Sequence, residues 1–127
     1  MSAESENISL DTIYLVNDSI KKVSLEIIIG APGQTSNSLI RLDDETPIED
    51  KHAGSYNETP IDSNKNLQGK TLWITTTISD TSRDTNYTEM IIRLRGGVVF
   101  REYHLSKTVD KEGDSVPYIC VIEFFKS

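Results

Sequence analysis

The chain has 127 residues, of which 36% are hydrophobic and 26% charged, the size and composition of one globular domain. Its formal net charge of −7, from 20 acidic and 13 basic residues, argues against nucleic acid or an anionic membrane as a partner, because both select basic surfaces. No apolar run approaches the roughly 20 residues of a membrane helix, and no secretory signal is visible, so a cytoplasmic protein is expected.

Apolar and polar residues alternate along most of the chain, which predicts strands. A flexible segment is expected at residues 1–7, followed by strands at 8–16 and 23–29. Gly30-Ala-Pro-Gly33 ends the second strand, because proline lacks the ladder donor and glycine accepts a positive φ. A short third strand is expected at residues 38–43.

Residues 44–68 form the one long irregular stretch, which an edge strand around 46–48 or 55–61 would shorten. The clearest strand follows at 70–79, where threonine and isoleucine, both β-branched, suit a pleated surface. Next comes a strand at 87–95. Gly96-Gly97 predicts a two-residue hairpin turn, with a return strand at 98–105. The final strand is expected at 117–125.

Seven strands at regular spacing, without a helix, predict one all-β domain over residues 1–127. The expected architecture is an antiparallel β-sandwich, with a closed antiparallel barrel as the alternative. The immunoglobulin Cys…Trp…Cys signature is absent, because the chain has one cysteine. That residue, Cys120, lies in an apolar run and is predicted to be a small core residue. No cofactor is expected.

Trp73, the only tryptophan, lies between Thr71 and Thr75 on the threonine-rich side of the strand at 70–79. Alternation turns it away from the apolar side of that strand. An aromatic ring among hydroxyl groups predicts a surface on which a sugar can stack. The alternative is that residues 44–68 or another strand cover the ring, because tryptophan is highly buried on average.

Oxygen-bearing side chains recur at every second position after the strand at 70–79, as in the first half of a calcium loop. These candidate metal ligands are Asp80, Ser82, Asp84 and Asn86. The glycine of an EF-hand turn is missing and Ile91 occupies the position of its closing glutamate, which favours backbone capping by these side chains instead. The acidic residues at 43–50, with His52 beyond, are expected to be solvated. If the third strand lies at a sheet edge, their charges would discourage edge-to-edge pairing.

The final strand is apolar on both sides, whereas a strand with one face in water alternates more cleanly. It is therefore either covered on both sides or in contact with another subunit. The candidate interface residues are Ile119, Val121 and Phe125. A symmetric dimer is the first expectation.

The sequence contains no recognised catalytic motif. His104, beside Glu102 and Ser106 on an expected outer face, could join a catalytic group only across strands. We therefore expect a non-enzymatic structural or protein-interaction module that self-associates or docks a protein partner through a sheet surface. The alternative is a carbohydrate-type binding module that uses Trp73 and the neighbouring loops, assisted by calcium.

Overall fold

The computed structural model describes residues 8–30, 34–43, 45, 47–80, 87–108 and 115–127, which excludes the predicted flexible segment at 1–7. This part of the chain forms nine strands and one short helix. In chain order they are β1 (Ile8–Val16), β2 (Lys22–Ile29), β3 (Gln34–Leu42), β4 (Glu49–Ala53), β5 (Tyr56–Ser63), α1 (Asn64–Leu67), β6 (Thr71–Asp80), β7 (Tyr87–Arg95), β8 (Arg101–Thr108) and β9 (Ser115–Lys126). No helix within these ranges is long and apolar enough to cross a membrane.

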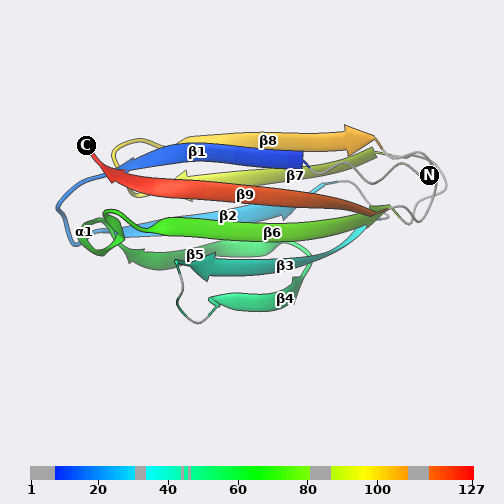
Figure 1. Ribbon diagram of the computed structural model, residues 1–127, viewed down its shortest axis with the longest axis horizontal. Coiled ribbons are helices and arrows are strands. Elements are labelled where there is room, and N and C mark those ends of the chain that lie inside the picture. Colours follow the sequence, from blue (N-terminus) through cyan, green and yellow to red (C-terminus); the bar gives the residue numbers. More distant parts are fainter. Residues whose placement is uncertain (1–7, 31–33, 44, 46, 81–86, 109–114) are drawn as a thin grey trace.

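The strands form two sheets that pack face to face (Figure 1). The five-stranded sheet has the order β1-β9-β6-β3-β4, and the four-stranded sheet has the order β5-β2-β7-β8. Every pairing is antiparallel except that of the two terminal strands, β1 and β9, which run parallel. The all-β sandwich predicted from alternation is confirmed, with nine strands instead of seven and without closure into a barrel.

The core lies between the sheets and is built from alternate residues of each strand, because successive side chains of a strand point to opposite faces. In β9 the even-numbered residues from Val116 to Phe124 are buried. Tyr14 packs edge to face against Phe124, with ring centroids 6.1 Å apart. Cys120 is buried there as predicted, and burial raises the pKa of its thiol to about 12, so the thiol stays protonated at neutral pH.

Residues 44–68 are not mainly a loop, because they contain β4, β5 and α1. The third strand is also longer than predicted, beginning at Gln34. Its first four residues were missed because they are all polar, although one of them, Ser36, is buried. The buried Ser38 hydroxyl is hydrogen-bonded inside the core, where its Oγ lies 2.8 Å from Oγ1 of Thr76.

The predicted two-residue turn at Gly96-Gly97 is wrong. β7 ends at Arg95 as expected, but β8 begins only at Arg101, and of the two glycines only Gly96 has a positive φ, +98°. The longer connection exists because it crosses the end of β1. Gly97 N donates to the Tyr14 hydroxyl at 3.0 Å, and that hydroxyl donates to the Val99 carbonyl at 2.6 Å.

Replacing Gly97 by alanine is expected to lower the free energy of unfolding by about 2–3 kcal/mol, because the new methyl group has no room. A Cβ at this position would lie 2.5 Å from Cε2 of Tyr14 and 2.7 Å from the Leu15 carbonyl oxygen. Urea unfolding measures the change. Gly54→Ala is the control: it has a positive φ of +76° but meets nothing within 4 Å, so it should cost only about 1 kcal/mol. Equal losses at both positions would contradict the packing argument.

Candidate functional site

The threonine-rich side of β6 and the second apolar side of β9 lie next to each other on the outer face of the five-stranded sheet. β6 and β9 pair with Trp73 opposite Val121 and Thr75 opposite Ile119. β3 follows on the other side of β6, with Arg41 opposite Trp73. The candidate ligand-binding residues and the candidate interface residues of the sequence analysis therefore form one surface and not two.

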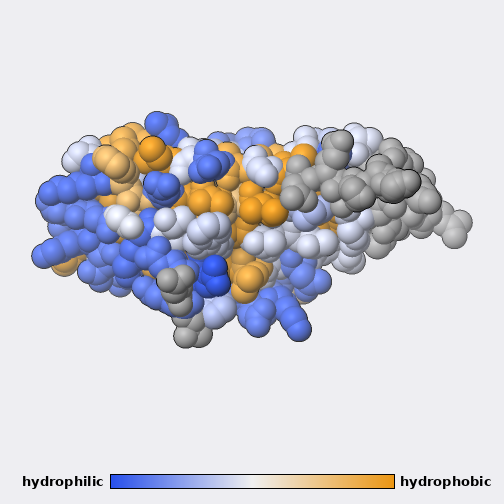
Figure 2. Space-filling view, in the orientation of Figure 1, coloured by the Kyte–Doolittle hydropathy of each residue, from blue (hydrophilic) through white to orange (hydrophobic). Residues whose placement is uncertain are grey.

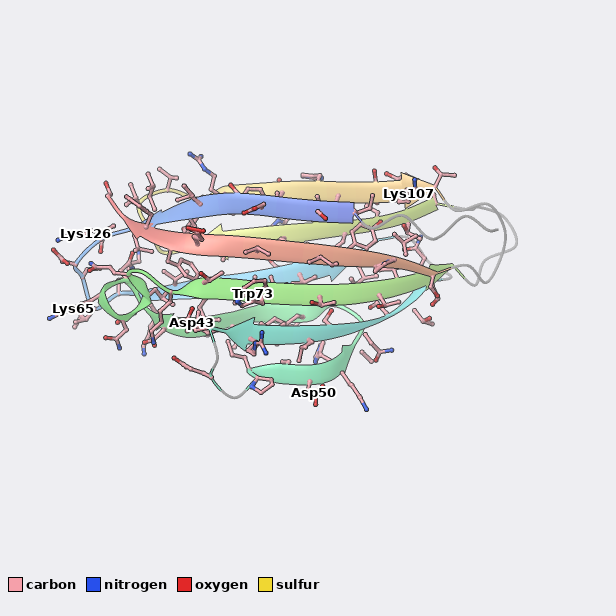
Figure 3. All side chains as sticks on the ribbon, in the orientation of Figure 1. Asp43, Asp50, Lys65, Trp73, Lys107 and Lys126 are labelled. Carbon is pink, nitrogen blue, oxygen red and sulfur yellow. The ribbon has the colours of Figure 1, made fainter. Side chains whose placement is uncertain are left out.

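We call this surface the Trp73 face. Its residues are Ser9, Asp11, Ile13 and Leu15 of β1, Ile119, Val121, Glu123 and Phe125 of β9, Thr71, Trp73 and Thr75 of β6, and Leu39 and Arg41 of β3. Figure 2 views this side of the molecule and shows apolar residues across its middle, with hydrophilic residues gathered toward one end. Figure 3 places Trp73 on β6, with Asp43 at the neighbouring end of β3 and Asp50 on the edge strand β4.

Several large apolar side chains on the Trp73 face are open to solvent. Trp73 is 39% exposed, Ile13 52% and Phe125 59%, while Ile119 and Val121 are half-buried between their neighbours. The alternative that residues 44–68 cover Trp73 is wrong, because their strands extend the edges of the two sheets. Contiguous exposed apolar groups usually mark a surface that contacts another molecule.

One row of four residues crosses the Trp73 face from β1 to β3: Asp11, Val121, Trp73 and Arg41. Its centre is apolar and its ends carry opposite charges about 14 Å apart, three strand spacings, so they cannot pair with each other. Neither Asp11 nor Arg41 forms an ion pair with a described residue, and Arg41 Nε is buried without a hydrogen-bond partner. Glu123, one row away, is likewise unpaired among the described residues.

The outer face of the four-stranded sheet differs, because it carries a group of charged side chains that neutralise one another. Glu26 accepts from Arg95 at 2.9 Å and lies 3.5 Å from Arg93, and Arg95 also lies 3.2 Å from Glu58. The hydrogen bond from Arg95 is the main reason that the pKa of Glu26 is lowered. Glu102 completes the network through Arg93. These charges are paired with one another, whereas Asp11, Arg41 and Glu123 on the Trp73 face form no ion pair with a described residue.

His104 and Glu102 lie on the outer face of the four-stranded sheet, as alternation predicted. Nε2 of His104 is 3.1 Å from Oε1 of Glu102. The pKa of Glu102 is lowered first by its hydrogen bond with Arg93 and then by His104, so its carboxylate is shared. Ser106, which the sequence placed beside them, has no hydrogen bond to His104 in the described residues. The pair therefore belongs to the ion-pair network.

The acidic residues after β3 are tied individually to nearby groups. Asp43 Oδ1 accepts from Thr71 N at 2.7 Å, Glu45 lies 3.0 Å from Lys70, and Nδ1 of His52 lies 3.4 Å from Glu49. β3 is not an edge strand; β4 is, and it carries the charged residues 49–51. Charges on an edge strand discourage pairing with other chains. The protection of a sheet edge that was expected for the third strand therefore applies to β4.

The candidate calcium ligands can be placed only at their start. Asp80 is the last residue of β6, and Ser82, Asp84 and Asn86 lie outside the described residues. Within the ranges that the structure describes, no three His, Cys, Asp or Glu residues are grouped so that they could hold a metal ion. Calcium binding at residues 80–86 stays a prediction.

Two features near the Trp73 face were missed from the sequence. The first is the pair of charges at Asp11 and Arg41, which have no ion-pair partner among the described residues. Alternation does place both on outer faces, but their common row depends on the strand order. The second is the β7–β8 connection, where Val98, Val99 and Phe100 are 39–50% exposed. Val98 N donates to the Leu15 carbonyl at 3.0 Å, which joins this apolar turn to the end of β1.

Comparisons with protein-family models, with curated proteins and with solved structures found no match to this chain. A function can therefore be argued only from the surfaces of the molecule itself. On the Trp73 face, exposed aromatic and aliphatic groups lie beside charges that form no ion pair within the part of the chain that the structure describes.

Proposed function

We propose that this chain is a non-enzymatic protein-interaction module and that the Trp73 face is its contact surface. The observation that carries the proposal is the row with Trp73 and Val121 at its centre and Asp11 and Arg41 at its ends, neither of which forms an ion pair with a described residue. Protein interfaces have the same anatomy, with an apolar, aromatic-rich core and a polar rim. Tryptophan and arginine are also the residues that most often dominate the binding energy.

Carbohydrate binding is the second candidate, because Trp73 is exposed beside the Thr71 and Thr75 side chains. A sugar stacked on the indole ring would cover Trp73 and its threonine neighbours. It would leave the apolar groups of β9, including Phe125, in water. A protein partner covers both strands at once, and so accounts for more of the exposed apolar surface.

Photocrosslinking in living cells tests the proposal. Benzoylphenylalanine replaces Thr75, which is exposed on the Trp73 face, or Ser106, which is exposed on the outer face of the four-stranded sheet. Light should join position 75 to a protein that mass spectrometry identifies, in the cytoplasm that the sequence predicts, while position 106 should give no discrete adduct. The proposal fails if position 75 gives no adduct, or if sugars rather than proteins shift the fluorescence of Trp73.

A further inference from the structure

We propose that the partner on the Trp73 face is a second copy of this chain, packed face to face about a two-fold axis that runs along the strands between β6 and β9. The inference rests on the proposed function and deepens it by naming the partner. It follows from the order of residues across the face, in which the charge at one end complements the charge at the other.

The two-fold axis reverses the row that crosses the face. Each Arg41 then lies over Asp11 of the second copy, and each Trp73 lies over Val121 of the second copy. Within one copy neither charge forms an ion pair with a described residue. In the dimer each finds a partner, and the contact occurs twice because a two-fold interface is self-complementary. Arginine suits such a contact, since its planar fork can donate two hydrogen bonds to one carboxylate.

The neighbouring rows are compatible with the same axis. In one, Ile119 lies over Thr75 of the second copy and Leu39 over Ser9, so no charge is buried. In the other, Glu123 lies over Thr71 of the second copy, whose hydroxyl can donate to the carboxylate. In the same row Ile13 lies over Asp43 of the second copy, at the outer side of the interface. Trp73 and Val121 therefore meet near the axis, Glu123 meets a hydroxyl group there, and the oppositely charged Asp11 and Arg41 meet away from it.

The size of the face is close to what a stable dimer requires. The axis between β6 and β9 superposes four strands of each copy, β1, β9, β6 and β3. Four strands about 4.8 Å apart and about nine residues long span on the order of 19 Å by 30 Å, or roughly 600 Å². A standard protein interface buries about 800 Å² on each partner. Stacked sheets prefer strand directions about 30° apart, which a two-fold axis inclined by about 15° to the strands produces. Arg41 lies only a short distance from the axis, so its long side chain can still reach Asp11 of the second copy after this rotation.

Pairing of β1 edges is a less favourable way to join two copies. Leu15 uses its carbonyl on the open side of β1 to accept from Val98, so the backbone left open to another strand is that of residues 9–13. Antiparallel pairing of two such segments about their midpoint would set Asp11 opposite Asp11 of the second copy. Like charges directly opposite each other destabilise a strand pair. The charge that disfavours the edge contact is the one that the face contact satisfies.

Sedimentation of the purified full chain with exchanged charges tests the arrangement. The wild type should dimerise with rising concentration, and the emission of Trp73 should shift to shorter wavelength as the ring is covered. Asp11→Arg and Arg41→Glu should each raise the dissociation constant about tenfold or more, because like charges then meet at both sites. The double variant restores opposite charges and should return to within about threefold of wild type.

If only the net charge of the chain mattered, the Asp11→Arg variant would behave in the opposite way. Asp11→Arg makes the chain less negative, so general repulsion by itself would strengthen the dimer instead of weakening it. Arg101→Glu, on β8 and exposed, is the matched control for Arg41→Glu and should leave the dissociation constant nearly unchanged.

Two results would overturn the inference. One is a wild-type chain that stays monomeric into the submillimolar range; if position 75 still crosslinks a different protein in cells, the proposed function stands and only the self-association is lost. The other is a dimer in which the double variant is as weak as the single ones, because the axis would then lie elsewhere.

Discussion

Replacing Asn64 by alanine is expected to lower the free energy of unfolding by about 3 kcal/mol or more. The residue is fully buried at the start of α1, and its side chain joins three separate segments. Its Oδ1 accepts from Asn17 N at 3.2 Å, and its Nδ2 donates to the carbonyls of Lys21 and Gly96, each at 2.9 Å. Alanine would leave Asn17 N and the Gly96 carbonyl without these partners in a place with little access to water.

Urea unfolding followed by circular dichroism measures this loss, and Asn66→Ala provides the control. Asn66 lies on the same short helix, but it is exposed, and its Nδ2 donates to Asp62 Oδ1 at 3.1 Å at the surface. Losing such a bond should cost less than about 1 kcal/mol, because water replaces the partner. If the two variants were equally stable, Asn64 would not hold the three segments together.

The sequence predicted the strands that alternate cleanly and missed those that do not. β1 and β7 were placed to the residue, because apolar side chains mark every second position. β4 was missed, and β5 was placed only as an optional edge strand at 55–61, because both strands carry few apolar residues. Each lies at the edge of its sheet and buries only part of one side. The turn at Gly96 was misjudged because its length is set by Tyr14, which is more than 80 residues away in the chain.

The outward direction of Trp73 and of Val121 could be predicted, but their adjacency could not. Alternation decides only to which face of its own strand a side chain points. Whether β6 and β9 are neighbours is a matter of strand order, which here includes a parallel pairing of the first and last strands. The threonine side of β6 and the apolar side of β9 therefore looked like alternative sites, one for a ligand and one for a subunit. Their pairing in one sheet makes them parts of the same surface.

Replacing Trp73 by alanine is expected to weaken dimerisation by about 2–4 kcal/mol, which is roughly thirty- to a thousand-fold in the dissociation constant. In the proposed dimer the ring lies near the axis and packs on Val121 of the second copy, so each variant dimer loses two such contacts. The stability of the monomer should change by only about 1 kcal/mol or less, because the exposed ring contributes mainly cross-strand contacts on the surface. Sedimentation measures the first effect, and unfolding at high dilution measures the second.

Leu72→Ala, at the adjacent position of the same strand, should have the opposite effects: a large loss of stability and little change in dimerisation. Leu72 is fully buried between the sheets, so its truncation should cost about 2–5 kcal/mol of unfolding free energy. As long as the variant stays folded, its Trp73 face is intact and its dissociation constant should stay close to that of the wild type. The comparison separates a binding surface from the core, because large apolar residues of a binding surface can be removed at little cost to folding. If Trp73→Ala instead unfolded the monomer and left association unchanged, the ring would be a structural residue and the contact surface would have to be sought elsewhere.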